Sequence, residues 1–255
     1  MSDFSTHAIL LRRIDHGDYD LIVTLMTKEY GKLSLIAKNA KKSIKRFSGV
    51  LELFSALDIV GKKGRGKLPV LMEASLVHPY TGIRSDILKT AYASYFAEVV
   101  NIWVEEGKPQ KDLYLLLEYV LHLLDRQVLS GEELSIIFQI RFLSLSGLSP
   151  NLTECGQCRT ILEQFHDNRI YIDFSKGGIL CSQCTSSRKD QRQLSAGTIK
   201  QLLWVNSGDL KKAERIRFTP RAVMEGLDFL EKFVLFQVGR EPNSLKFLRN
   251  IRMTK

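Results

Sequence analysis

The amino-acid sequence, 255 residues long, predicts an α+β protein, and three observations support that fold class. Short segments rich in Val, Ile, Leu and Thr fill the first eighty residues, as in a β domain. From Ser85 onward apolar residues recur at spacings of three and four, which is the helical period. Two Cys-x-x-Cys pairs interrupt the helical part. The chain therefore combines a sheet, a set of helices and a small cysteine-bearing insertion.

Five short strands are expected within residues 1–80. No connection between them is long enough for the crossover helix of a parallel sheet, so a small antiparallel barrel is favoured. The five-stranded barrel of this size is the OB-fold. The expected strands cover residues 8–12, 21–27, 33–37, 51–60 and 70–78.

Helices are expected through most of the remaining chain. Ser85 is a plausible N-cap for the first of them, and Pro220 after Thr219 suits a helix start because proline lacks only an already unpaired N–H. The expected helices cover residues 85–106, 112–129, 132–148, 195–205 and 220–238, with a short last helix from 241 through 248. The predicted domains are an OB-fold DNA-binding domain (1–80), a helical domain in two parts (81–150 and 193–255) and a zinc ribbon between them (151–192).

All four cysteines lie within thirty residues, as Cys155-x2-Cys158 and Cys181-x2-Cys184. Four thiolates in two such turns can surround one Zn²⁺ ion and leave no coordination position for a catalytic water, so the predicted zinc is structural. One alternative is an iron–sulfur centre, because thiolates also bind iron. The other is a redox or vestigial cysteine site. His166 lies between the pairs and is expected on the surface.

The formal net charge of +9 favours polyanionic partners such as nucleic acid. It amounts to +5 in residues 1–80, −3 in 81–150, +1 in 151–192 and +6 in 193–255. Residues 38–67 alone contain nine Lys or Arg and two acids, in two loops that could line one groove of the barrel. The predicted DNA contacts are Arg13, Lys38, Lys41, Lys42, Lys45, Arg46, Lys62, Lys63, Arg65 and Lys67.

One apparent nucleotide-binding motif is rejected. Residues 61–67 match G-x-x-x-x-G-K, but Leu68 stands where a phosphate-binding loop needs Ser or Thr for Mg²⁺. Pro69 and a strand-like run follow where that motif needs a helix. The segment is expected to be a basic hairpin turn.

Phe47 and Phe54 could stack on bases, but we expect them in the barrel core.

No catalytic constellation is recognised, so the chain is not expected to be an enzyme. Asp15, Asp18 and Asp20 could hold a metal but more often such residues form a turn. The N-terminus lacks the features of a signal peptide, and apolar runs are too short to cross a bilayer. A cytoplasmic location is therefore expected.

Several segments together resemble the RecO family of bacterial DNA repair and recombination mediators. The N-terminal matches are DYDLIVTLMT at 18–27, YGKL at 30–33, AKNAKK at 37–42 and RFSGVL at 46–51. The later matches are GLSP at 147–150, CGQC at 155–158, GGILC at 177–181 and SLKFL at 244–248. The resemblance covers nearly the whole chain and keeps the order of its parts.

The resemblance implies a protein without enzymatic turnover that binds single- and double-stranded DNA and anneals complementary strands. It implies cooperation with RecR and single-strand-binding protein in loading the RecA recombinase, and an association with the bacterial nucleoid. Binding of the single-strand-binding protein tail is implied for the helical domain. Three alternatives stay open: a transcription or translation factor, a nuclease that uses the three aspartates with Mg²⁺, and a structural adaptor.

Overall fold

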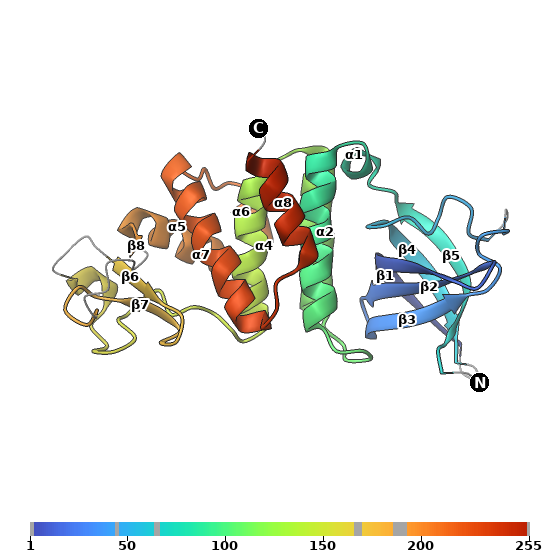
Figure 1. The fold of residues 1–255 in the computed structure, drawn as a ribbon, viewed down its shortest axis with the longest axis horizontal. Coiled ribbons are helices and arrows are strands. Elements are labelled where there is room, and N and C mark those ends of the chain that lie inside the picture. Colours follow the sequence, from blue (N-terminus) through green and yellow to red (C-terminus); the bar gives the residue numbers. More distant parts are fainter. Residues whose placement is uncertain (1–2, 44–45, 64–66, 166–169, 186–192, 254–255) are drawn as a thin grey trace. The chain divides into compact units, whose positions relative to one another are not determined.

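The chain has the predicted α+β fold, with an N-terminal barrel followed by helices and a small cysteine-bearing sheet (Figure 1). It divides into two compact units, one of residues 1–127 with 242–255 and one of residues 128–241. The domain boundaries expected at residues 80, 150 and 192 stay predictions. The computed structural model describes residues 3–43, 46–63, 67–165, 170–185 and 193–253.

The first unit begins with a closed five-stranded barrel. Its strands are β1 (Asp3–His16), β2 (Asp20–Thr27), β3 (Gly31–Ala37), β4 (Ala56–Lys62) and β5 (Val70–His78). Their order around the barrel is β1-β2-β3-β5-β4, with β3 and β5 parallel and the other neighbours antiparallel. This topology confirms the predicted OB-fold.

Strand β1 is long because it belongs to two neighbours. Its residues 3–9 pair with β4, and its residues 8–16 pair with β2, with an irregularity in that second register between Leu10 and Arg12. The prediction that the fourth strand begins at residue 51 was wrong. Residues 51–55 form turns, with Phe54 at φ 70°, and β4 begins only at Ala56. The apolar residues of that stretch face the core without belonging to a strand, which a period-two pattern cannot distinguish.

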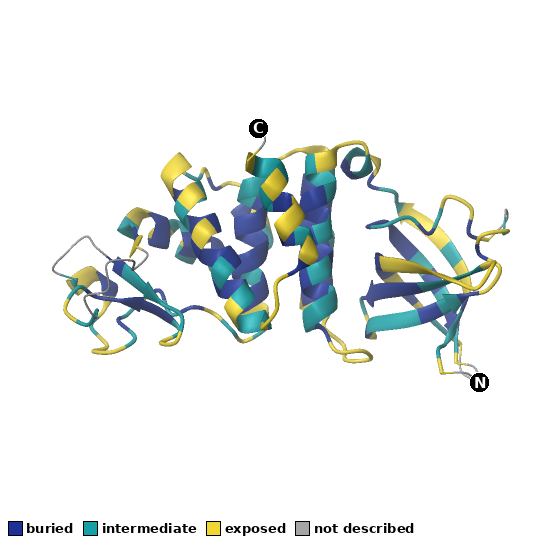
Figure 2. Cartoon of the chain, in the orientation of Figure 1, coloured by how far each residue is buried: buried dark blue, intermediate teal, exposed yellow. Residues whose placement is uncertain are grey.

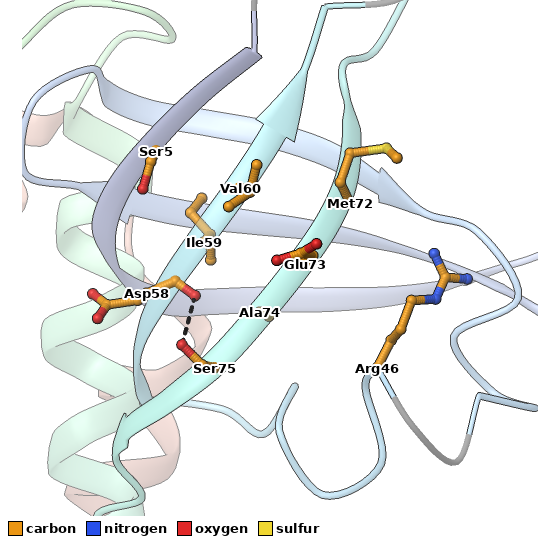
Figure 3. A pocket seen from close by; sticks show the side chains of 9 residues that line it. All are labelled: Ser5, Arg46, Asp58, Ile59, Val60, Met72, Glu73, Ala74 and Ser75. Carbon is orange, nitrogen blue, oxygen red and sulfur yellow. Dashed lines mark hydrogen bonds between the residues drawn. The ribbon is translucent and has the colours of Figure 1, made fainter.

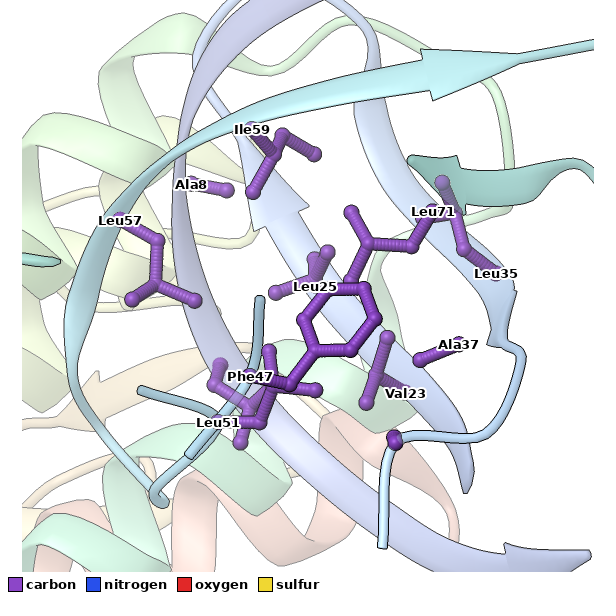
Figure 4. Packing of buried hydrophobic residues seen from close by; sticks show 12 residues of the cluster. Ala8, Val23, Leu25, Leu35, Ala37, Phe47, Leu51, Leu57, Ile59 and Leu71 are labelled. Carbon is purple, nitrogen blue, oxygen red and sulfur yellow. The ribbon is translucent and has the colours of Figure 1, made fainter. Parts of the chain in front are cut away.

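Residues 38–55 connect β3 to β4, and we call them the plug segment because several of their described side chains pack into the barrel core. Among its described residues Ala40, Phe47 and Leu51 belong to the barrel core, and Phe47 is only 4% exposed. Figure 4 shows the Phe47 ring among side chains of several strands, including Leu25 and Val23. The expectation that Phe47 lies in the barrel core is thus confirmed, and Phe54 is buried as well, at 2% exposed.

Four helices complete the first unit: α1 (Thr81–Arg84), α2 (Ile87–Trp103), α3 (Lys111–Arg126) and α8 (Asn243–Met253). The Asp86 side chain caps α2 by accepting hydrogen bonds from Leu88 N and Lys89 N. Ser85, the expected N-cap, instead ends the separate short helix α1. Helix α8 joins α2 through the Glu98 carboxylate, which accepts a hydrogen bond from Ser244 N at 2.8 Å.

The barrel is tied to the end of α2 and the loop that follows by three hydrogen bonds. Lys32 Nζ donates to the carbonyl oxygen of Asn101 at 2.7 Å, and Ser34 N donates to Glu106 Oε1 at 2.8 Å. Gly107 N donates to the carbonyl oxygen of Lys32 at 2.9 Å. Strand β3 therefore pairs with its neighbouring strands within the barrel and is also hydrogen-bonded to the end of α2 and to the loop after it.

The second unit contains helices and a three-stranded sheet of order β7-β6-β8. Buried side chains run along most of α4 (Figure 2). Ser130 caps this helix in a capping box with Glu133, as its position before a helical pattern suggests. The helices are α4 (Gly131–Leu145), α5 (Ala196–Asn206), α6 (Leu210–Ala213) and α7 (Pro220–Val238). The other elements are η1 (Leu162–Gln164), β6 (Ile170–Asp173), β7 (Gly178–Leu180) and β8 (Gln193–Leu194).

Phe174, in the turn after β6, anchors the small sheet to α7. Its ring centroid lies 5.8 Å from Phe233 and 5.9 Å from Phe236. Aromatic pairs at these distances stabilise beyond the area they bury, by about 0.5–1.5 kcal/mol each.

None of the described helices combines the length and apolar content that crossing a bilayer requires.

Replacing Gly31 by alanine is expected to destabilise the first unit by more than about 2 kcal/mol. A Cβ atom there would lie 1.8 Å from the Lys108 carbonyl oxygen, and the φ of +70° also disfavours a side chain. Gly49→Ala is the matched control, because Gly49 has φ +68° and nothing within 4 Å. We expect Gly49→Ala to cost only the backbone term of about 1 kcal/mol. Equal urea midpoints for the two variants would contradict the clash.

The Glu225 carboxylate joins α7 to the start of α5. It accepts hydrogen bonds from Ser195 N at 2.8 Å, Thr198 Oγ1 at 2.5 Å and Arg221 Nε at 2.6 Å. Burial alone would raise the pKa of Glu225, but these hydrogen bonds outweigh it and lower the pKa to about 2 from its ordinary 4.5. The stabilisation is therefore fully present above pH 4.5 and is lost as the pH falls toward 2.

Glu225→Ala is expected to lower the free energy of unfolding by about 2 kcal/mol at pH 7, because hydrogen bonds to a charged group are lost. The difference from the parent chain should shrink between pH 4.5 and pH 2, in urea titrations at several pH values. Asp228→Ala is the control, since Asp228 lies on the same helix, has a side chain that is 51% exposed and pairs across one turn with Lys232. That surface pair should contribute less than about 1 kcal/mol.

Candidate nucleic-acid interface and metal centre

The plug segment holds a cluster of exposed basic residues whose backbone is fixed by the β1–β2 turn. Asn39, at φ 57°, donates its backbone N–H to Asp20 Oδ1 at 2.7 Å, and Lys41 N donates to the Tyr19 carbonyl oxygen at 3.0 Å. The buried Ala40 and Phe47 hold the same stretch from the inside. Lys38, Lys41, Lys42 and Arg46 consequently point outward from a constrained backbone.

These basic side chains already have partners within the barrel. Lys41 Nζ lies 3.0 Å from Asp15 Oδ2, and Lys42 Nζ lies 3.4 Å from the centroid of the Tyr19 ring. Arg46 Nη2 donates to the Lys38 carbonyl oxygen at 3.1 Å. Because all of these groups are solvent-exposed, the contacts are weak and leave the charges accessible to a polyanion.

Arg13 has a different role from the other predicted DNA contacts. Its Nη1 donates to the Leu51 carbonyl oxygen at 2.9 Å and lies 3.0 Å from Glu52 Oε1. Arg13 therefore fastens the plug segment to β1, and its contact with DNA stays a prediction.

The second basic cluster lies at the β4–β5 turn. Lys62 pairs with Val70 at the ends of the antiparallel strands β4 and β5, so the rejected nucleotide motif is followed by a strand and not by a helix. Residues 64–66 of that motif lie outside the described residues. Lys63 and Lys67 are exposed there, and Lys62 Nζ lies 3.7 Å from Asp3 Oδ1. Two further predicted contacts, Lys45 and Arg65, lie outside the described residues.

The two clusters extend in opposite directions from the seam where β3 meets β5. Ile36 pairs with Val70 there, and Ile36 N donates to the Pro69 carbonyl oxygen at 2.9 Å. Since the strands are parallel, Lys38 follows the seam while Lys67 precedes it. A strand of nucleic acid lying along the seam would meet both clusters.

A groove of about 490 Å³ on the outer face of β4 and β5 contains only part of the predicted interface (Figure 3). Arg46 reaches into it beside Met72, whereas Asp58 and Glu73 supply negative charge. No described lysine of the β4–β5 turn lines this groove. The expectation that both loops line one groove is therefore not met by this cavity.

The three aspartates proposed as an alternative metal site do not gather. Asp15 pairs with Lys41, while Asp20 accepts the Asn39 backbone N–H. Within the described ranges, one group of His, Cys, Asp or Glu side chains is placed to hold a metal ion, and it consists of Cys155, Cys158, Cys181 and Cys184.

The four cysteine sulfur atoms lie within 4.8 Å of one another, and all four are free thiols. The Cys158 and Cys181 sulfurs are 3.7 Å apart, far beyond a disulfide bond of about 2.0 Å. Tetrahedral thiolates at about 2.3 Å from a zinc ion would stand about 3.8 Å apart. The donor set and its spacing therefore fit one tetrahedral metal ion.

The backbone around the cysteines supports the metal-binding form. Cys181 N donates to the Cys155 sulfur at 3.5 Å, and Gly156 N donates to the Ile179 carbonyl oxygen at 2.9 Å. The hydrogen bond with Cys158 raises the pKa of Cys184, whereas hydrogen bonds from the Thr160 hydroxyl and backbone lower the pKa of Cys158 to about 6. Such bonds favour the thiolate, which is the form that ligates metal. His166, expected on the surface, lies outside the described residues.

The fold and this centre define the class: an OB-fold protein that carries a helical region and a four-cysteine ribbon that could hold a metal ion. Residues 1–80 match the family model described as Recombination protein O N terminal, and residues 84–246 match Recombination protein O C terminal. The chain belongs to the RecO family of DNA repair proteins.

Full-length relatives agree with this assignment. The chain is 44% identical to DNA repair protein RecO of Desulfatibacillum aliphaticivorans, covering 99% of this chain and 98% of the relative. It is 43% identical to the RecO protein of Desulfosudis oleivorans, with 99% of both chains covered. Against that of Syntrophus aciditrophicus the identity is 34%, over 97% of this chain and 95% of the relative.

Cys181→Ser is expected to abolish tight metal binding, because three thiolates cannot complete the tetrahedral shell. Elemental analysis of the purified parent chain should find one zinc ion per chain, and the variant should contain far less after dialysis against a chelator. Ser182→Ala, next to the ligand, is the control and should retain the metal. Equal metal content in Cys181→Ser and the parent would refute the site.

Proposed function

We propose that this chain is a recombination mediator that binds single- and double-stranded DNA and anneals complementary strands without ATP. Membership of a DNA repair family supports the substrate. The observation that carries the mechanism is the exposed basic cluster of the plug segment, fixed beside the β3–β5 seam. Cationic side chains there would neutralise phosphates of both strands, which lowers the repulsion that opposes pairing.

The proposed role is non-enzymatic. The segment that resembles a nucleotide-binding loop connects two strands, so it has no helix N-terminus to receive phosphate. Of the three aspartates that could have served a nuclease, Asp15 pairs with Lys41 and Asp20 accepts the Asn39 N–H. Among the described residues, the three do not form a metal-binding group. The driving force for annealing would come from base pairing itself, with the protein lowering the electrostatic barrier.

We infer that the metal is zinc and that it is structural. Four cysteine ligands favour zinc over harder metals, and a closed thiolate shell offers no position for a reacting water. The ribbon has a very small core of its own, made of Cys155, Leu180 and Cys181. A bound ion would hold it together, as metal does in other small domains.

The proposed partners are RecR, the tail of single-strand-binding protein and, indirectly, RecA. They follow from the family to which the chain belongs, and the place of action would be the cytoplasm, at the nucleoid. We propose that the helical domain (81–150 and 193–255) receives the single-strand-binding protein tail while the barrel (1–80) holds DNA, and that the ribbon (151–192) stabilises the helical domain.

The triple variant Lys41→Ala, Lys42→Ala, Arg46→Ala is expected to anneal complementary labelled strands at least about tenfold more slowly than the parent chain. It removes three charges, and each single-strand phosphate contact contributes about 0.7 to the slope of log affinity against log salt. Fluorescence transfer between the strands, measured without ATP, gives the annealing rate. Binding of one labelled strand, measured across a salt series, gives the slope of log affinity against log salt. The slope should fall by up to about 2.

A control variant removes the same charge elsewhere: Lys211→Ala, Lys212→Ala, Arg215→Ala, all exposed in and after α6. It should anneal at nearly the parental rate. Equal losses in both triple variants would mean that net charge matters and the plug segment does not. Absence of annealing and of DNA binding by the parent chain at low salt would leave a metal-stabilised adaptor as the better description.

A further inference from the structure

A second cavity lies at the other end of the β3–β5 seam from the plug segment. Its volume is about 300 Å³, at the small end of the range for ligand pockets. Its walls are mainly apolar and come from Phe4 on β1, Tyr30 in the β2–β3 turn, Leu33 on β3 and Pro69 before β5. Asp3, Gly107 and Lys63 of the second basic cluster complete the lining.

The aromatic walls are held in place. Phe4 lies across Gly61, its partner on β4, where a Cβ atom would come within 2.2 Å of the ring. The Phe4 and Tyr30 rings meet edge to face with centroids 5.2 Å apart. Tyr30 N donates to Thr27 Oγ1 at 3.0 Å, which fixes the turn that carries the ring. The cavity is therefore formed before any ligand arrives.

The surroundings of the cavity specify the chemistry of its ligand. Tyr30 is 41% exposed although its ring is large and mostly apolar, so part of it is available for stacking. Lys63 in the lining and Lys67, two residues before Pro69, are exposed cations. The negative charge of Asp3 in the lining is offset by Lys62, whose Nζ lies 3.7 Å from Asp3 Oδ1. A group that presents a flat apolar face next to a negative charge matches both features, and a nucleotide of single-stranded DNA is such a group.

We propose that this cavity is a base-binding pocket, in which Tyr30 and Phe4 receive one unstacked nucleobase while Lys63 and Lys67 contact the adjoining phosphates. The proposal rests on the proposed DNA binding and makes it specific. A base within a duplex is stacked and paired and cannot enter, so the pocket distinguishes single strands from duplex. A base that pairs with its complement leaves the pocket, which releases the annealed product.

Tyr30→Ala tests the pocket through a ratio of affinities. It should weaken binding of a fluorescent oligothymidine by about tenfold, the size expected for one lost stacking contact, and leave binding of a duplex of equal length unchanged. The salt dependence should not change, because no charge is removed. Tyr30→Phe keeps the ring and should bind like the parent. Trp204→Ala removes an aromatic side chain that is 44% exposed on α5 and should have no effect.

A direct measurement does not depend on the stability of any variant. Single-stranded DNA with one 5-iodouracil should photocrosslink to the parent chain at Tyr30 or Phe4, as located by mass spectrometry of the peptides. Crosslinks confined to other parts of the chain would overturn the pocket, as would an unchanged single-strand to duplex affinity ratio in folded Tyr30→Ala.

The pocket and the broader function fail in different ways. Parental binding of both DNA forms, with Tyr30→Ala indistinguishable from the parent, removes the pocket and keeps the mediator role. Failure of the parent chain to bind either form removes both. Peptide binding that Tyr30→Ala weakens, with no effect of that substitution on DNA binding, would assign the cavity to an apolar peptide side chain. That result also overturns the nucleobase assignment.

Discussion

The burial of Phe47 and Leu51 in the barrel opening is the constraint on which the proposed DNA interface depends. The described part of the plug segment contains no helix or strand, so its conformation depends on hydrophobic anchoring and on the hydrogen bonds from Asn39 to Asp20 and from Lys41 to Tyr19. Each buried aromatic or aliphatic anchor contributes about 1.5–3 kcal/mol. The same anchors that complete the core thus turn the neighbouring lysines toward solvent.

The internal partners of these cations are suited to exchange. Lys41 with Asp15, and Lys42 with Tyr19, form exposed contacts of the kind that contribute roughly 0–1 kcal/mol. A phosphate could replace them at little cost, while the partners keep the long side chains ordered before DNA arrives. Electrostatic attraction to one side of the β3–β5 seam and stacking on the other would then act on the same strand, with salt weakening only the first.

The second unit meets a different problem, because its ribbon is too small to bury a sizeable core. Among the described residues, Cys155, Leu180 and Cys181 form the ribbon's own buried cluster, and both cysteines belong to the proposed metal site. Phe174 adds contacts with α7, and Glu225 binds the first turn of α5 directly after the ribbon. The proposed metal ion, an aromatic anchor and a partly buried carboxylate would together compensate for the missing apolar area.

The sequence by itself determined the fold class, the barrel topology and the family, and it singled out the four cysteines of the proposed metal site, because strand patterning, helical periodicity and Cys-x-x-Cys spacing are local signals. It also placed Phe47 in the core. It misplaced the start of β4, because Leu51 and Phe54 are buried although they belong to no strand. Only the tertiary structure brought Phe4, Tyr30 and Pro69 around one cavity and separated the two basic clusters along the seam. Such groupings depend on barrel closure between residues far apart in the chain, which no local pattern encodes.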